Sequence, residues 1–256
     1  MSGNVQVISR VATILNAMVE RGASTLKELS DVAELPVSTT SRLLSSMQQV
    51  GFVERDPTTK EYGLGSGFLR MAALAEPRKD IASLLRPVLN ELSATTTEDS
   101  AIAELISGAA VIIDRVDGEH PLRIIDRLNV PELLYVGAFR KVLLAYQEES
   151  WIEDYFERAP FVRYTDRSIC DRGAMRDELR FIRERGYAYS FGERITDAGG
   201  IAAPIFGPTG AIRAAVQIAG PIARIDETTA DALRVHVIAA ARKCTERLGG
   251  SFCTGN

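Results

Sequence analysis

The sequence predicts an α+β protein of two parts, an N-terminal winged helix-turn-helix followed by a larger domain with an antiparallel sheet and helices on its faces. Three observations lead to this prediction. Residues 8–50 carry apolar side chains at helical spacing, residues 52–65 have the pattern of a short hairpin, and from residue 100 short apolar runs are interleaved with helical patterns. The 256 residues suffice for two domains of about 100 to 150 residues each.

The composition is that of a globular chain, with 46% hydrophobic and 25% charged residues, and it excludes disorder. No apolar run approaches the roughly 18 residues that a membrane span needs. The N-terminal "MSGNVQVISR" is polar where a signal peptide has an apolar core. We therefore expect no membrane contact and a cytoplasmic protein.

The cysteines indicate neither a disulfide framework nor a zinc site. Cys170, Cys244 and Cys253 are odd in number, widely spaced and without a CxxC pair. We expect reduced thiols, no metal and no cofactor.

Net charge does not separate the functional classes. Seven basic and seven acidic side chains balance in residues 1–75, and the other 23 basic and 27 acidic residues carry the net charge of −4. A nucleic-acid-binding domain is often basic. Contacts to a polyanion would therefore depend on the placement of charge and not on an excess of it.

Three helices are predicted in the first 50 residues. The first covers 8–21 and stops at Gly22. Thr25 and Glu28 fit a capping box for the second, 26–34. Pro36 suits the start of the third. The apolar stripe of this third helix consists of Val37, Leu43, Leu44, Met47 and Val50. Short helices joined by a tight turn are typical of a helix-turn-helix.

The stripe leaves hydroxyls and an arginine to divide between partial burial and solvent: Ser38, Thr39, Ser41, Arg42 and Ser45. Near a helix N-terminus such groups can contact phosphates and base edges. On this helix alone, capping and plain solvation explain them equally well.

A hairpin after the helix favours the DNA interpretation. Gly51 ends the helix, "FVERD" alternates like a strand, "PTTK" makes a turn and "EYGLG" returns. The resulting winged helix would carry Arg55, Thr58, Thr59 and Lys60 on its wing, and the third helix would be a recognition helix.

The run from Val5 to Ala75, above all "LPVSTTSRLLSSMQQVGFVERD" followed by "YGLGSGFLRMA", resembles the DNA-binding domain of the isocitrate lyase regulator (IclR) family of bacterial transcription factors. The "TTSR" of residues 39–42 departs from the more usual Thr-Ala-His/Tyr-Arg, so the resemblance implies no operator sequence. The residues expected at DNA are Thr25, Ser38, Thr39, Thr40, Ser41, Arg42, Ser45, Arg55 and Lys60.

Beyond the wing we expect a linker helix at 66–76, broken at Pro77, and a helix over 79–96 in which Pro87 makes a kink or a junction. Five or six strands are then expected from "AIAELI", "AVIIDRV", "LRIIDRL", "AYSF", "GIAAPIF" and "AIRAAVQIAG", with helical patterns near 138–157, 174–185 and 226–248. We predict three segments: the winged helix-turn-helix at 1–65, the linker helix at 66–76 and the effector-binding domain at 77–256.

The second half, especially "IAAPIFGPTGAIRAAVQIAGPIARI", is similar to the GAF-like effector-binding domain of the same family. Carried over by position, the resemblance implies an effector pocket of Ala138, Phe139, Arg140, Ser190, Glu193, Gly200, Gln217 and Ala219. Arg140 stands where the family favours glycine. With fewer small hydroxyls and acids than the family pattern, this pocket should prefer something other than a very small keto acid.

Arg140 and Lys141 near a helix N-terminus could hold a carboxylate. Alternatively, Arg140 projects into solvent or pairs with Glu148 or Glu149. Glu193 matches a family-typical glutamate, and structural hydrogen bonding is its alternative role.

Two rival classes of protein remain. An enzyme is disfavoured, since the chain has no GxSxG, GxxxxGK[ST], HExxH or GxGxxG motif and only His120 and His236 as histidines, so we expect no catalytic residue. A Cys170 nucleophile between Arg167 and Arg172 is the remaining catalytic alternative, without a recognisable base. The other rival is a winged helix that contacts proteins, with a C-terminal dimer module.

The resemblance implies a regulator that binds double-stranded, palindromic operator DNA as a homo-oligomer, a dimer or a tetramer, and responds to a small organic effector, a carboxylate or an aromatic compound. Repression is the expected mode, and activation is the alternative. A dimer would read two half-sites about one helical turn or a multiple apart.

Overall fold

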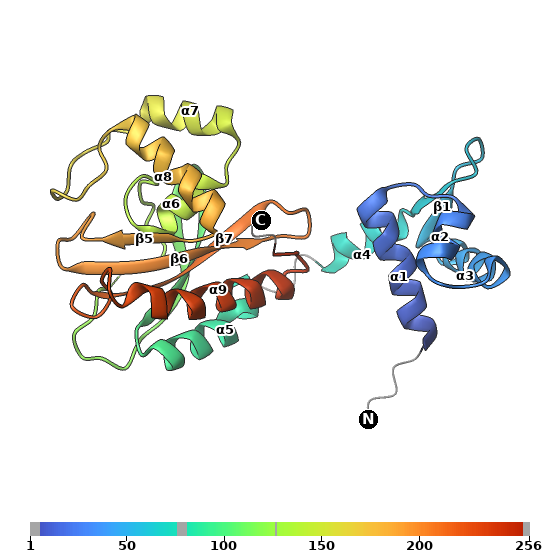
Figure 1. Cartoon of the computed structure of the whole chain (residues 1–256), viewed down its shortest axis with the longest axis horizontal. Coiled ribbons are helices and arrows are strands. Elements are labelled where there is room, and N and C mark those ends of the chain that lie inside the picture. The colour runs from blue at the N-terminus through green and yellow to red at the C-terminus, as the bar shows by residue number, and fades with distance from the viewer. Residues whose placement is uncertain (1–5, 76–80, 126, 253–256) are drawn as a thin grey trace. The chain divides into compact units, whose positions relative to one another are not determined.

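The computed structural model describes residues 6–75, 81–125 and 127–252. The chain divides into two compact units, Met1–Lys79 and Asp80–Asn256, which are considered separately. The predicted break at Pro77 lies outside the described residues. Figure 1 shows a small helical unit with a hairpin and a larger unit built on a sheet.

The first unit contains the three predicted helices, α1 (Gln6–Arg21), α2 (Leu26–Val32) and α3 (Val37–Gln49). The capping box at α2 is confirmed: the Thr25 hydroxyl accepts from the Glu28 amide, and the Glu28 carboxylate accepts from the Thr25 amide. The helices enclose a core with Ile14, Leu29 and Leu44. Val37 and Val50, predicted for the buried stripe of α3, are about half exposed because they lie at its two ends, beyond the core.

The predicted wing is confirmed. Strand β1 (Val53–Arg55) pairs antiparallel with β2 (Tyr62–Leu64), and α4 (Gly67–Ala75) follows. Gly65 and Gly67 fit tightly, since a Cβ atom would lie 2.4 and 2.5 Å from the Gly51 carbonyl oxygen. The Gly67 amide donates to that oxygen at 2.9 Å and so fixes the start of α4 against the turn between α3 and β1.

The second unit is built on an antiparallel sheet of five strands in the order β4-β3-β7-β6-β5. The strands are β3 (Asp99–Ile106), β4 (Ala109–Val116), β5 (Ala188–Phe191), β6 (Ala198–Phe206) and β7 (Ile212–Pro221). Alternate residues enter two cores: Ala101, Ala202 and Ala215 belong to one, and Ile102, Ile201 and Val216 to the other. The unit therefore has three layers.

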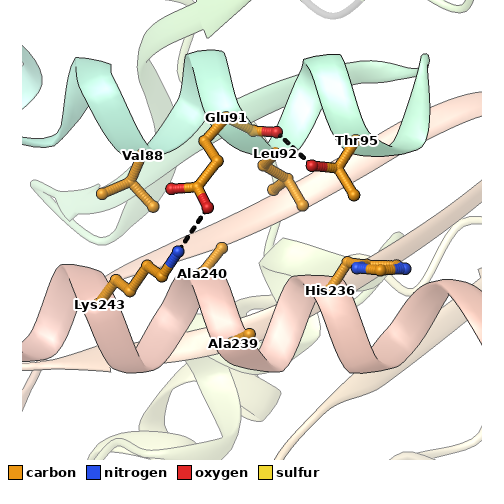
Figure 2. A pocket seen from close by; sticks show the side chains of 8 residues that line it. All are labelled: Val88, Glu91, Leu92, Thr95, His236, Ala239, Ala240 and Lys243. Carbon is orange, nitrogen blue, oxygen red and sulfur yellow. Dashed lines mark hydrogen bonds and ion pairs between the residues drawn. The ribbon is translucent and has the colours of Figure 1, made fainter.

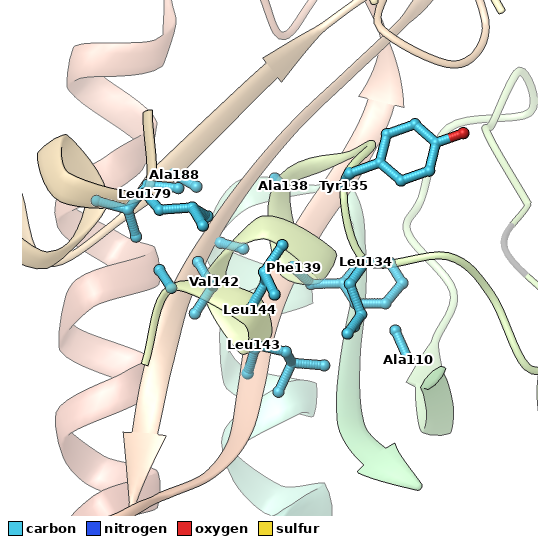
Figure 3. Packing of buried hydrophobic residues seen from close by; sticks show 14 of the residues in the cluster. Ala110, Leu134, Tyr135, Ala138, Phe139, Val142, Leu143, Leu144, Leu179 and Ala188 are labelled. Carbon is cyan, nitrogen blue, oxygen red and sulfur yellow. The ribbon is translucent and has the colours of Figure 1, made fainter. Parts of the chain in front are cut away.

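The helices cover both faces. One face carries α5 (Ile81–Thr96) and α9 (Ala230–Arg247), and the other carries α6 (Ala138–Ala145), α7 (Glu149–Arg158) and α8 (Arg172–Arg185) (Figure 1). All eight residues of α6 are buried. Figure 3 shows its apolar side chains, Phe139, Val142 and Leu143 among them, packed against side chains such as Leu134 and Leu179.

Four expectations for this unit need correction. Residues 122–128 form no strand: within the described part, Leu128 makes only an isolated bridge to Ile112. The helix expected over 138–157 is interrupted at 146–148, where the chain turns from the enclosed α6 to the surface helix α7. The last helix begins at Ala230, after a turn stabilised by the Asp226 carboxylate. Helix α5 continues through the exposed Pro87, so no junction falls there, and the kink stays a prediction.

Candidate functional site

The exposed face of α3 carries three of the expected side chains. Ser38, Arg42 and Ser45 are exposed, and Thr39 and Ser41 are half-buried. Spacings of three and four residues place Ser38, Arg42 and Ser45 on one side of the helix. The face thus presents hydroxyl donors and acceptors around one guanidinium group, a set that suits phosphates and base edges.

Thr40 does not belong to this face. Its side chain is completely buried, and its hydroxyl donates to the Pro36 carbonyl at 3.3 Å. The expectation that Thr40 contacts DNA is corrected, because the residue lies on the side of α3 that packs into the core with Leu44 and Met47. Gln49 was missed: it is exposed and follows Ser45 by one helical turn, a spacing visible in the sequence.

The N-terminus of α3 lacks a side-chain cap among the described residues, since its N-cap is Pro36. The Thr39 amide of the first turn donates to the Pro36 carbonyl at 2.9 Å, and the exposed start of the helix is a place where a phosphate oxygen can bind. Thr25 is exposed at the N-cap of α2, and its hydroxyl is already engaged in the capping box.

The wing places its two expected basic residues at its exposed end. Arg55 Nε donates to the Lys60 carbonyl at 3.1 Å and its guanidinium lies over the Tyr62 ring, while Lys60 Nζ donates to the Pro57 carbonyl. The Asp56 carboxylate accepts from the Thr58 and Thr59 amides, and these bonds hold the pKa of Asp56 below its ordinary value. The turn is thus preformed, with two cations beside it.

In the second unit, seven of the eight residues expected at an effector site line one pocket. They come from α6, the end of β5 and the turn after it, the start of β6 and the second half of β7: Ala138, Arg140, Ser190, Glu193, Gly200, Gln217 and Ala219. Phe139 is the exception. Its ring is buried in the hydrophobic core that α6 forms with its neighbours, so the expectation that it lines the pocket is corrected.

Six further residues complete this pocket: Ile124, Gly137, Arg194, Ile195, Ala198 and Gly199. Arg194 and Ile195 directly follow Glu193 in "GERI", and this adjacency could have identified them as pocket residues from the sequence. Ile124 belongs to the segment expected as a strand, so the sequence pattern assigns it to the sheet. The pocket holds about 450 Å³ of empty space, its opening to solvent included.

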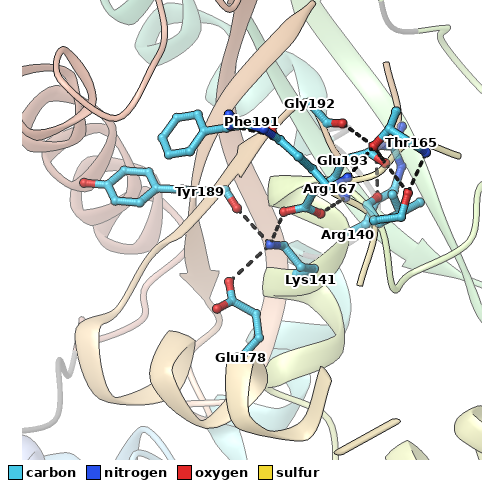
Figure 4. A network of polar contacts seen from close by, with 12 residues as sticks. Arg140, Lys141, Thr165, Arg167, Glu178, Tyr189, Phe191, Gly192 and Glu193 are labelled. Carbon is cyan, nitrogen blue, oxygen red and sulfur yellow. Dashed lines mark hydrogen bonds and ion pairs between the residues drawn. The ribbon is translucent and has the colours of Figure 1, made fainter. Parts of the chain in front are cut away.

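A buried ion-pair network lies behind the pocket (Figure 4). Lys141 Nζ lies 2.5 Å from Glu193 Oε1 and 3.1 Å from Glu178 Oε1, and it donates to the Tyr189 carbonyl. The other Glu193 oxygen accepts from the Gly137 amide at 3.0 Å. All of these Lys141 contacts are to protein groups. They agree with the alternative role of Glu193, which is structural hydrogen bonding.

Arg140 takes neither of its two alternative positions. It is nearly completely buried, forms an ion pair with Glu132 and donates to the Val136 carbonyl. Pairing with Glu148 or Glu149 and projection into solvent are both wrong, because the first turn of α6 is enclosed. Gly137 makes room for this arginine: its φ is 96°, and a Cβ atom there would lie 2.4 Å from Arg140 Nη1.

A second hollow lies on the opposite helical layer, between α5 and α9 (Figure 2). His236 lines it beside Thr95, and Lys243 Nζ lies 2.5 Å from Glu91 Oε1 at its edge. None of the residues expected to bind DNA or an effector lines this hollow.

Two of the side chains considered for catalysis are His120 and Cys170. His120 Nε2 lies 3.0 Å from the Thr97 hydroxyl, and Cys170 is a half-buried free thiol. In residues 6–75, 81–125 and 127–252 no group of three metal-ligating side chains could hold an ion. Across the same residues, every helix is too short or too polar to cross a bilayer.

Comparison with known families matches both units. Residues 73–246 match the family described as "Bacterial transcriptional regulator IclR C-terminal", and residues 7–57 match "IclR helix-turn-helix domain". The helix-turn-helix and the α/β pocket domain thus define a transcriptional regulator. The chain belongs to the IclR family.

Individual relatives are similar over nearly the whole chain. The regulator KipR of Bacillus subtilis is 26% identical over 97% of this chain and 99% of its own, and the repressor IclR of Escherichia coli is 28% identical over 97% and 92%. A crystal structure from Silicibacter sp. TM1040, assigned as an IclR transcriptional regulator, is 28% identical, covers 96% of this chain and 97% of its own, and gives a TM-score of 0.89. An IclR homolog of Microbacterium hydrocarbonoxydans complexed with 4-hydroxybenzoate shares the fold at 23% identity and a TM-score of 0.61, covering 94% and 98%.

Proposed function

We propose that this IclR-family regulator is a repressor that binds a palindromic operator and is released or retained by a small organic effector. The observation that carries the proposal is the combination, in one chain, of an exposed hydroxyl and arginine face on α3 with a pocket that contains Arg140 and Arg194. The first suits DNA and the second suits an anionic organic molecule.

For the DNA contact we assign the base-reading role to Ser38, Arg42, Ser45 and Gln49, which share one face. Thr25 and the start of α3 would hold phosphates, and Arg55 and Lys60 would contact the backbone beside the helix. Thr39 and Ser41, half-buried at the edge of the face, would contribute at its border. Thr40 is left out because of its burial.

We further propose the three-segment organisation, with the winged helix-turn-helix at 1–65, the linker helix at 66–76 and the effector domain at 77–256. One winged helix reads one half-site, so a palindromic operator requires a homodimer, or a homotetramer for two operators. A cytoplasmic location follows from this role. Activation is the alternative, since the sign of regulation depends on where the operator lies.

For the effector we propose a carboxylate or an aromatic compound. The pocket joins charged groups to apolar ones such as Ile124 and Ile195. The complex of the Microbacterium homolog with 4-hydroxybenzoate supports an aromatic acid as the first compound to test.

The test is binding of the purified chain to the DNA upstream of its own gene at two salt concentrations, with and without a panel of aromatic and aliphatic carboxylates. Binding should be sequence-selective and should weaken steeply with salt, because phosphate contacts release counterions. One compound should change it by about 5- to 150-fold, the usual range of such coupling.

A scrambled duplex of equal length is the control. Equal affinity for both duplexes would contradict sequence reading. Absence of binding at low salt would make the other use of a winged helix, contact with a protein, the leading function.

A further inference from the structure

Two arginines of the pocket share one internal carboxylate. Arg140 Nη2 pairs with Glu132 Oε2, and Arg194 Nη1 pairs with Glu132 Oε1. Each oxygen of Glu132 thus receives one guanidinium group, the arrangement that an organic carboxylate would adopt between the same two arginines.

The three residues lie where two hollows meet. Arg140 and Arg194 line the effector pocket described above, and both also line a neighbouring hollow to which Glu132 contributes. The ion pairs therefore stand between the two spaces. Movement of the Glu132 side chain would leave the anion position between the two guanidinium groups to a ligand that entered the pocket.

The backbone of Glu132 is fixed independently of its side chain. Its amide donates to the Ala110 carbonyl and its carbonyl accepts from the Ala110 amide, both at 2.9 Å, which anchors the residue to the edge strand β4. A carboxylate on such an anchor can rotate away from the arginines without loss of the surrounding structure.

Two other charged groups near the pocket, Glu193 and Lys141, have partners of their own. Glu193 accepts from Lys141 and from the Gly137 amide, and Lys141 also contacts Glu178. Glu132 is the carboxylate that Arg140 and Arg194 share. A neutral side chain at position 132 would remove one negative charge from this shared wall.

The surroundings of the arginines are apolar and accessible. Half-exposed side chains at the two hollows include Ile195 at 51%, Tyr164 at 44% and Val130 at 38%. An aromatic or branched body attached to a carboxylate would cover these groups while its carboxylate reached the arginines.

We propose that Glu132 is an internal competitor: its carboxylate occupies the anion position between Arg140 and Arg194, and an aromatic or branched carboxylate effector binds by displacing it. This inference rests on the proposed function, since it assigns the chemistry of the same pocket. It makes Glu132 a specificity-determining residue, because a neutral ligand cannot take its place between two cations.

The test compares the full-length protein with its Glu132→Gln variant by calorimetric titration with benzoate and 4-hydroxybenzoate, and with benzamide as a neutral probe. The substitution keeps the shape of the side chain and removes its charge. We expect the two carboxylates to bind E132Q at least tenfold more tightly than the original protein, and benzamide to bind both equally.

The matched control is Glu153→Gln, which removes a carboxylate from Arg176 on the surface of α7 and α8 and changes the net charge by the same amount. It should leave carboxylate affinity unchanged. An Arg194→Gln variant, at an arginine that is 40% exposed, gives the opposite test and should weaken carboxylate binding at least tenfold without affecting benzamide.

The inference is overturned if E132Q binds the carboxylates as the original protein does, if benzamide gains as much as benzoate, or if neither protein binds a carboxylate. Operator binding by the same proteins is measured in parallel. Loss of the proposed function would appear as absent operator binding, which is a separate result.

Discussion

The Nζ atom of Lys141 lies 2.5 Å from Oε1 of Glu193, so that the first turn of α6 is joined to the segment after β5. Both side chains are at least nine-tenths buried. A buried ion pair of this kind contributes little compared with apolar packing, but the loss of one partner leaves an uncompensated charge in the interior. The wall of the pocket that Glu193 lines therefore depends on the pair being complete.

We expect Lys141→Met to destabilise the second unit by about 3 kcal/mol, since the buried Glu193 carboxylate would lose its cationic partner. The double variant Lys141→Met/Glu193→Gln should lose less than Lys141→Met alone. Urea unfolding followed by the fluorescence of Trp151, the single tryptophan and a residue of α7, reports on this unit. Unchanged stability of the single variant would contradict the role of the pair.

Thr40 should be a stability residue and Ser38 a surface residue. Thr40→Ala removes a methyl group and a hydroxyl from a completely buried site and should cost about 1 to 2 kcal/mol. Ser38→Ala should change stability by no more than about 0.5 kcal/mol. Hydrogen exchange of peptides from α1 to α3 measures both. Faster exchange in the Ser38 variant than in the Thr40 variant would reverse the assignment.

Arg42 is the cation of the exposed face of α3. Arg42→Ala should weaken operator binding by about 1 to 3 kcal/mol. If the guanidinium binds a phosphate, the slope of affinity against salt should also fall by about one charge, whereas a base contact would relax sequence preference instead. Arg180→Ala, at an exposed position of α8, is the control. Equal affinities of both variants would exclude Arg42 from the interface.

The cysteines should differ sharply in reactivity. Burial raises the pKa of Cys244 to about 12, so its thiolate forms in the folded protein only as the pH approaches that value. A thiol with a raised pKa stabilises the folded state below its ordinary pKa, and this contribution is lost as the pH rises through about 12. Cys170 is half-buried and should react at once at pH 8.

The measurement is the rate of labelling by a chromogenic disulfide reagent at pH 8 in a Cys253→Ser background. The Cys170→Ser/Cys253→Ser protein retains Cys244 and should label only as fast as the second unit opens. Labelling as rapid as that of Cys170 would show that Cys244 is accessible.

Local pattern sufficed for much of the architecture. The spacing of apolar residues predicts α1, α2 and α3, together with the helix start signal at Thr25 and the stop signals at Gly22 and Gly51. These signals act within a few residues. The wing followed from alternation around a turn. The strand expected at 122–128 shows the limit: a short apolar run has the same appearance whether it joins a sheet or crosses the surface beside a pocket.

The sequence by itself determined the family, the elements of the first unit and seven residues that line one pocket of the second unit, because helix periodicity, turn chemistry and the family pattern are all carried by neighbouring residues. Only the tertiary structure decided that Thr40 faces the core, that Phe139 packs into a hydrophobic core and that Glu132 lies between Arg140 and Arg194. The partner of a buried charge is set by which distant segments meet. Glu132 and Arg194 are 62 residues apart, and no local signal reports that contact.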